Sequence, residues 1–160
     1  MSRRCALIGY VCAAASVCAP GAGTWSAPRI LLEHTGRYSS LEFDTAGRGH
    51  LALYDYVNGD LWYGSCEPGA DWVFETVDAA PGRGWYSSLA LDSAGRPHIA
   101  YSGNREWDLL HAWHDGQAWQ YETIDSTGDV GLYCTLALDS ADRGRICYAD
   151  KDNGLTKFAW

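Results

Sequence analysis

Short runs of apolar and polar residues, separated by turn signals, make up most of the chain. Runs such as residues 98–102 and 119–124 are rich in aromatic and β-branched residues, which favour strands. Glycine or aspartate stands at their ends, as in Asp115-Gly116, a strong signal for a tight turn between two strands. No window keeps apolar residues at the i, i+3, i+4, i+7 spacing of a helix over three turns. The pattern therefore predicts an all-β protein.

The strand pattern repeats with a period of about 47 residues. Residues 37–44, 85–92 and 132–139 match one another, and their tyrosines, Tyr38, Tyr86 and Tyr133, are 48 and 47 positions apart. Four strands in a unit of this length are typical of a propeller blade. We therefore predict a β-propeller-type repeat domain over residues 23–160, with three four-stranded antiparallel blades. The units are about 36–78, 84–125 and 131–160, and the strands of the first are expected at about 38–44, 49–54, 60–65 and 72–78.

The third unit has no fourth strand, because the chain from residue 156 to residue 160 aligns with the third strand of the second unit. Trp25 lies 47 positions before Trp72, where a fourth strand would begin. An uncovered edge strand invites aggregation. We therefore expect residues 25–32 to complete the last blade.

Residues 86–101, YSSLALDSAGRPHIAY, resemble a repeat that is common in secreted bacterial proteins and is expected to form propeller blades. The resemblance covers nearly all of residues 25–160 and implies an architecture, with no particular activity. In the third unit Arg145 stands where His98 stands in the second. The turn after Asp92 is loosely similar to the Asp-box of sialidases, but it lacks the aromatic residue that closes that box.

The N-terminal residues have the features of a secretory signal peptide, which we assign to residues 1–22. Arg3 and Arg4 supply the positive charge, an apolar stretch follows, and small residues around Ala19 suit cleavage. This stretch is shorter than the ~20 residues of a membrane-spanning helix. We therefore expect a secreted, extracellular or periplasmic protein with no membrane span.

The net charge of −8 weighs against two classes of partner. Nucleic acids and anionic membrane surfaces both attract basic proteins. No residue is assigned a catalytic role, and no metal site or cofactor is predicted. Of the cysteines that follow the signal peptide, Cys134 and Cys147 fall on predicted neighbouring strands, where a disulfide is possible in an oxidising compartment.

Several polar residues recur in the repeat, and we interpret them as structural. Asp44, Asp92 and Asp139 each precede a turn that an aspartate side chain can cap. His50 and His98 occupy equivalent positions in separate blades, so they are expected to be framework residues. The segment 150–154 is expected to be a plain turn. The recurring tryptophans are expected to belong to the core, and these are Trp72, Trp113, Trp119 and Trp160.

The predicted ligand face lies where the loops between blades meet the loops between the second and third strands. Trp85 and Trp107 lie beside variable loops, outside the shared pattern, and are the best candidates for exposure. Aromatic, arginine and carboxylate side chains together suit a ligand-binding face. The predicted ligand-binding residues are Arg37, Tyr38, Tyr56, Asn58, Asp60, Arg83, Trp85, Tyr86, Arg105, Trp107 and Asp108.

Three functions and three kinds of assembly fit this pattern. The favoured function is a secreted binding module for a glycan or an extracellular protein; the alternatives are a sialidase-like glycoside hydrolase fragment and a structural piece of a larger propeller. Three blades are fewer than the 4–8 of ordinary propellers. We therefore expect a head-to-tail homodimer that closes a six-bladed ring. A fragment of a longer propeller and a strained three-bladed ring are the alternatives.

Export is expected to remove the N-terminal segment, with cleavage between about Ala19 and Gly23. Intact-mass measurement of the exported protein checks this expectation. A full-length mass in the exported fraction would contradict it.

Overall fold

The computed structural model describes residues 26–105 and 107–160, which form three antiparallel sheets without a helix. In the first sheet the strands lie in the order β1 (Arg37–Phe43), β2 (Gly49–Asp55), β3 (Asp60–Cys66), β4 (Val73–Asp78). The second has the order β5 (Arg83–Leu91), β6 (Pro97–Gly103), β7 (Leu109–His114), β8 (Trp119–Asp125). The third has the order β11 (Leu155–Ala159), β10 (Gly144–Asp150), β9 (Leu132–Leu138).

The all-β fold and the repeated strand order are confirmed. The predicted strands of the first unit differ by one residue at most from the observed ends, whereas β5 begins at Arg83, earlier than its repeat position suggests. The predicted signal peptide, residues 1–22, lies outside the described residues.

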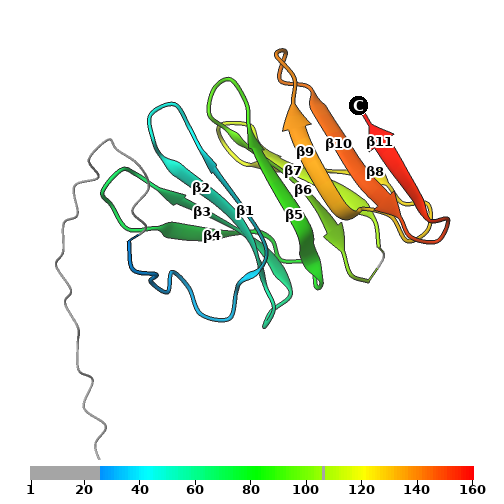
Figure 1. The fold of residues 1–160 in the computed structure, drawn as a ribbon, viewed down its shortest axis with the longest axis horizontal. Coiled ribbons are helices and arrows are strands. Elements are labelled where there is room, and N and C mark those ends of the chain that lie inside the picture. Colours follow the sequence, from blue (N-terminus) through cyan, green and yellow to red (C-terminus); the bar gives the residue numbers. More distant parts are fainter. Residues whose placement is uncertain (1–25, 106) are drawn as a thin grey trace, which may run out of the picture.

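The prediction that residues 25–32 complete the last blade is wrong for the single chain. Residues 26–32 form no strand, and the third sheet has three strands among the described residues. Arg29 instead lies 3.8 Å from Asp71, just before β4. The short link to β1 holds this segment beside the first sheet, whereas β11 lies at the opposite end of the molecule (Figure 1).

The sheets stand side by side in the order of the sequence, with β5 between β1 and β9 (Figure 1). Apolar residues from facing sheets form two separate cores. Leu61, Leu89 and Ile99 belong to the core between the first and second sheets. Leu109, Leu136 and Ile146 belong to the core between the second and third.

The innermost strands are joined by hydrogen bonds that repeat from sheet to sheet. The backbone N–H of Leu89 donates to Ser40 Oγ over 3.0 Å, and that of Leu136 donates to Ser88 Oγ over 3.0 Å. Next to them, the Ser87 hydroxyl donates to the Tyr38 carbonyl. At the second contact the thiol of Cys134 donates to the Tyr86 carbonyl over 2.9 Å.

Two expectations about single residues are corrected by this packing. Trp160, predicted to be a core residue, is 85% exposed, because no sheet covers that side of the third sheet. Cys134 and Cys147 form no disulfide. Cys134 points towards the second sheet and is buried, whereas Cys147 is exposed.

Replacing Ser88 with alanine is expected to lower the free energy of unfolding by about 1–3 kcal/mol, because the buried N–H of Leu136 loses its acceptor. Urea unfolding at one fixed protein concentration measures the change. Ser126→Ala, at an exposed loop position, is the control and is expected to stay within about 0.5 kcal/mol of the parent. Equal stabilities of the Ser88→Ala and Ser126→Ala variants would show that the contact contributes nothing.

Candidate functional site

The loops between sheets and the loops between second and third strands meet at one end of the molecule, here called the loop end. The N–H groups of Gly82 and Arg83 donate to the Gly59 carbonyl over 2.8 and 2.9 Å. Between the next two sheets, Val130 N–H donates to the Trp107 carbonyl over 2.8 Å. The predicted ligand face therefore draws on loops that contact one another.

Three tyrosines, Tyr38, Tyr86 and Tyr133, form a row at the loop end, here called the tyrosine row. The ring centroids of Tyr38 and Tyr86 are 4.5 Å apart, as are those of Tyr86 and Tyr133. Each has a left-handed backbone, with φ of 54°, 54° and 52°. In each inner strand the pairing register shifts beside the tyrosine, so each lies at a bulge. Bulges redirect side chains, which accounts for the shared direction of the three rings.

This backbone conformation is rare for a bulky residue and costs about 1–3 kcal/mol at each position. Burial raises the pKa of the Tyr86 hydroxyl, and hydrogen bonds with the hydroxyls of Tyr133 and Tyr38 raise it further. The Tyr86 hydroxyl is therefore neutral at physiological pH, and its ring lies between two others at tilted angles of 49° and 51°. Tyr133, the last member of the row, is exposed.

Trp85 and Trp107 flank the row, but neither is as exposed as we expected. The ring centroid of Trp85 lies 5.2 Å from that of Tyr38 and 5.9 Å from that of Trp107, and both tryptophans are half-buried. The Nε1–H of Trp85 is buried without a hydrogen-bond partner among the described residues. Lys151 Nζ lies 5.4 Å from the ring centroid of Trp107, within the range of a cation–π contact.

A pocket of about 640 Å³ opens at the free end of the row. Tyr86, Tyr133 and Trp107 are the aromatic residues of its lining, and Asp150 and Lys151 are the charged ones. Leu132, Ala149, Leu155 and Thr156 supply most of the rest of the lining. This is an open depression on the third sheet, beside the row.

The other predicted ligand residues are dispersed around the loop end. Arg37 lies 6.0 Å from the ring centroid of Tyr56. Asn58 donates to Asp55 Oδ2 over 2.7 Å, and Arg83 Nε lies 4.0 Å from Asp78 Oδ2. The remaining members are Arg105, which is exposed, and Asp108, whose carbonyl accepts the N–H of Gly103 over 3.4 Å.

Asp60 is a predicted ligand residue with a carboxyl group whose pKa the structure raises. Burial raises the pKa of its carboxyl group, and the nearby Asp55 and Asp78 carboxylates raise it further. Those two neighbours have structural partners. Asp55 accepts the Val57 N–H over 2.9 Å, and Asp78 accepts the Tyr101 hydroxyl over 2.7 Å.

Sequence reasoning selected Tyr38 and Tyr86 and missed Tyr133 and Lys151. Tyr133 was available from the repeat itself, because it occupies the same position as the two tyrosines that were chosen. Lys151 carried no such signal. It reaches Trp107 because its N–H donates to the Asp129 carbonyl over 2.8 Å, which joins two loops that are distant in sequence.

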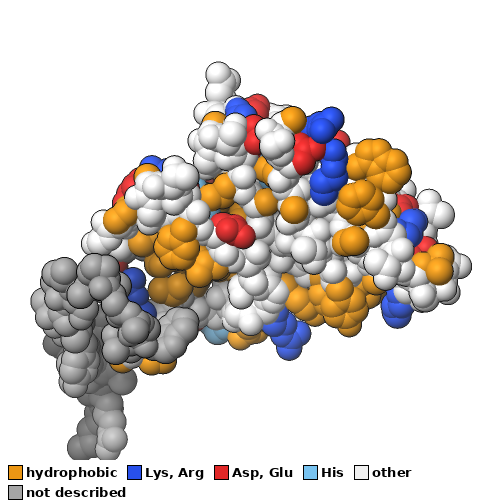
Figure 2. All heavy atoms as spheres, turned by 45° about the horizontal axis from the view of Figure 1, so that its top comes forward, with side chains coloured by type: hydrophobic (Ala, Val, Ile, Leu, Met, Phe, Trp, Pro, Cys, Tyr) orange, Lys and Arg blue, Asp and Glu red, His pale blue; other side chains and the backbone are white. Residues whose placement is uncertain are grey.

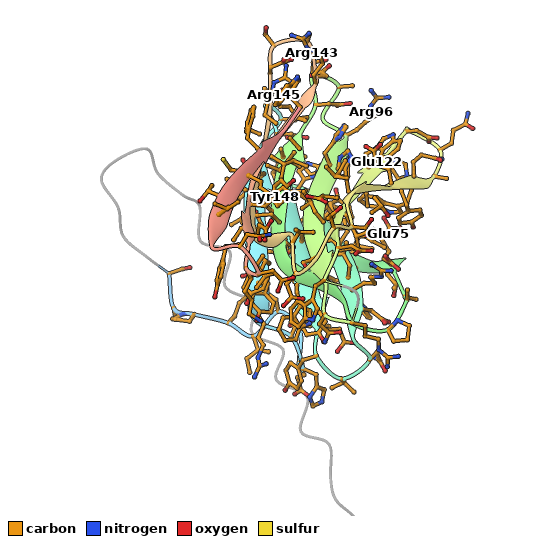
Figure 3. All side chains as sticks on the ribbon, turned by 90° about the vertical axis from the view of Figure 1, so that its right-hand side faces the viewer. Glu75, Arg96, Glu122, Arg143, Arg145 and Tyr148 are labelled. Carbon is orange, nitrogen blue, oxygen red and sulfur yellow. The ribbon has the colours of Figure 1, made fainter. Side chains whose placement is uncertain are left out.

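At the opposite end, the recurring aspartates cap their own turns, as predicted. Asp44 Oδ1 accepts the N–H groups of Ala46 and Arg48, both over 2.9 Å. Asp92 and Asp139 make the equivalent bonds. Figure 3 shows Arg96, Arg143 and Arg145 together at this end, where they pair with these carboxylates.

The histidines near these turns belong to the framework of separate sheets. His50 Nδ1 lies 2.6 Å from the Tyr63 hydroxyl, and His98 Nδ1 lies 3.2 Å from His111 Nε2. Burial lowers the pKa of both His50 and His98, and the charge of His111 lowers that of His98 further. Among the described residues no group of three or more metal-binding side chains comes together.

A search of protein-family models found no match to the chain. A search of curated proteins found no similar sequence. Within residues 26–105 and 107–160 no helix has the length and apolar character needed to cross a bilayer.

Stability is expected to fall as the pH drops from 7.5 to 5.5. In the folded state the pKa values of His50 and His98 lie below the ordinary 6.5 of histidine, so the unfolded chain binds protons first. Urea midpoints across this range measure the loss. The double variant His50→Gln/His98→Gln is expected to lose less on acidification, and a loss equal to that of the parent would contradict the assignment.

Proposed function

We propose that this chain is a secreted, propeller-type binding module that holds a carbohydrate against the tyrosine row. The observation that carries the proposal is the recurrence of a left-handed tyrosine at three bulges. A backbone conformation that costs free energy at three equivalent positions is expected to serve a function. Here it brings three aromatic rings into one row. Bulges next to binding sites commonly redirect side chains in this way.

The chemistry of the row suits a sugar. Aromatic rings offer flat apolar faces with polar edges, and sugar rings present C–H faces with hydroxyl groups around them. Trp107 and Lys151 extend the surface with a further ring and a hydrogen-bond donor. The net negative charge of the chain supports a neutral ligand over a polyanion.

A hydrolase is the less favoured function. Glycoside hydrolysis commonly requires two carboxyl groups in different protonation states on either side of the scissile bond. Asp60 has the raised pKa of a candidate acid. However, its neighbours Asp55 and Asp78 are held by structural hydrogen bonds, and the Tyr101–Asp78 bond recurs as Tyr148–Asp125, over 2.8 Å. These carboxylates are thus engaged by groups of the protein itself.

A glycan array probed with the mature protein is expected to give at least one neutral glycan that binds. For the strongest such glycan, Tyr86→Phe removes a hydroxyl and keeps the ring, and should weaken binding up to about tenfold. Trp107→Ala removes a ring and should weaken binding by about tenfold or more. Isothermal titration measures both effects.

Tyr121→Phe is the matched control, because Tyr121 lies on the outer strand β8 and is exposed. Its affinity should equal that of the parent. Equal affinities for all three variants would show that the row does not bind the glycan. Turnover of a panel of fluorogenic glycosides would instead establish a hydrolase, and binding to proteins alone would establish a different partner.

A further inference from the structure

Each contact between two sheets has a donor side and an acceptor side. Among the described residues the donor side of the first sheet and the acceptor side of the third sheet have no neighbouring sheet to contact. At both internal contacts the following sheet supplies a side-chain donor, from Ser87 or Cys134, and the preceding sheet supplies a hydroxyl acceptor, from Ser40 or Ser88. Ser39 occupies the donor position of the first sheet and is exposed. In the third sheet the acceptor position is held by a threonine, Thr135, which is also exposed.

Apolar side chains show the same contrast between internal and open faces. Leu89 and Leu136 are 3% and 6% exposed, but Leu41, at the same repeat position in the first sheet, is 52% exposed. On the third sheet Phe158 is 53% exposed, although its counterparts, Tyr63 and His111, are buried. Figure 2 shows apolar side chains gathered at the right-hand end of the molecule, over the third sheet.

The glycines at the beginning of the inner strands give a third, independent match. A Cβ on Gly84 would lie 3.0 Å from the Cα of Leu61, and one on Gly131 would lie 2.8 Å from the Cα of Leu109. Gly36 holds the same repeat position with φ of +107°, yet a Cβ there would meet no atom of the described residues within 4 Å, its chain neighbours aside. The strand position of Leu61 and Leu109 is taken in the third sheet by Thr156, which lines the 640 Å³ pocket.

We propose that the first sheet of a second copy of this chain docks, head to tail, on the open face of the third sheet. The Gly36 loop of one copy enters the pocket beside Thr156 of the other. Ser39 donates to the Tyr133 carbonyl of its neighbour, and Leu41 packs where Leu89 and Leu136 pack inside the chain. Two copies then hold six sheets, a number within the range of closed propellers, and each open face is covered once.

The N-terminal segment provides a further reason for a second copy. Ile30 is 82% exposed, whereas Val77, 47 positions later, is 5% exposed on β4. When the first sheet of one copy docks on the third sheet of another, residues 26–32 reach the free edge of β11. The fourth strand that the single chain lacks is thus supplied by its neighbour. The tyrosine row also continues from Tyr133 to the second copy's Tyr38.

Sedimentation velocity on the purified full-length mature protein tests this assembly, and a dimer mass is the expected result. Leu41→Arg places a charge on the first sheet's open face. Cys147→Arg places one on the third sheet's open face, at the position of Ala52 and Ala100, which are fully buried. Each variant alone is expected to be a folded monomer, because both parent residues are exposed in the single chain.

An equimolar mixture of the two variants separates head-to-tail contact from any symmetric contact. The intact first sheet of Cys147→Arg can still dock on the intact third sheet of Leu41→Arg, so the mixture should recover a dimer with one interface. Val73→Arg, at an exposed position on β4 outside both open faces, is the control and should remain a parental dimer. Circular dichroism confirms that each variant has folded.

A monomeric parent protein at about 100 µM would overturn the proposal, as would a dimer that neither arginine variant disrupts. Longer open oligomers that both variants abolish would retain the contact and overturn ring closure. Glycan binding is measured separately on the monomeric variants, with the tyrosines in place. A variant that loses the dimer but still binds the glycan therefore tests the assembly alone. A dimer that binds no glycan tests the proposed ligand alone.

Discussion

The architecture depends on which groups accept hydrogen bonds from the backbone N–H groups on the unpaired side of each innermost strand. β1, β5 and β9 each pair with a strand on one side only, so the N–H groups on the other side need partners. The hydroxyl of Ser40 accepts one such N–H from Leu89 on β5, and that of Ser88 accepts one from Leu136 on β9. A side-chain acceptor keeps the backbones of neighbouring inner strands further apart than direct pairing would. The sheets therefore stay separate, and two distinct cores form between them.

Most of the fold could be predicted, because it follows from information local to each unit. Strand periodicity, turn aspartates and the 47-residue repeat are all visible in short windows. Burial depends instead on what lies beyond the unit. Trp113 and Trp160 occupy the same repeat position, but Trp160 is exposed because no sheet lies behind it. Residues 26–32 likewise have a strand-like position in the sequence, but in the single chain they lie far from the edge of β11 and form no strand (Figure 1).

The location of the candidate site could be predicted from the sequence, but less of its detailed geometry could be. The convergence of the loops followed from the repeat, and it brought Tyr38, Tyr86, Trp85 and Trp107 together as expected. The left-handed backbone of the tyrosines was not visible, because tyrosine gives no signal for that conformation as glycine does. The two tryptophans were expected to be exposed because they lie outside the repeated pattern. In the structure Trp85 packs against Tyr38 and Trp107, and both tryptophans are partly buried.

The identity of the two internal contacts has a consequence for how such genes can change. Each sheet contacts its neighbour through backbone and hydroxyl atoms at the same repeat positions. These contacts can therefore form whichever unit comes before. Duplication or loss of a whole 47-residue segment by unequal recombination would preserve these repeated contacts. Mutational drift at the inner-strand serines is constrained far more tightly, because each of them bonds a neighbouring sheet. Arrays of this kind can therefore evolve in length more readily than in the sequence of their inner strands.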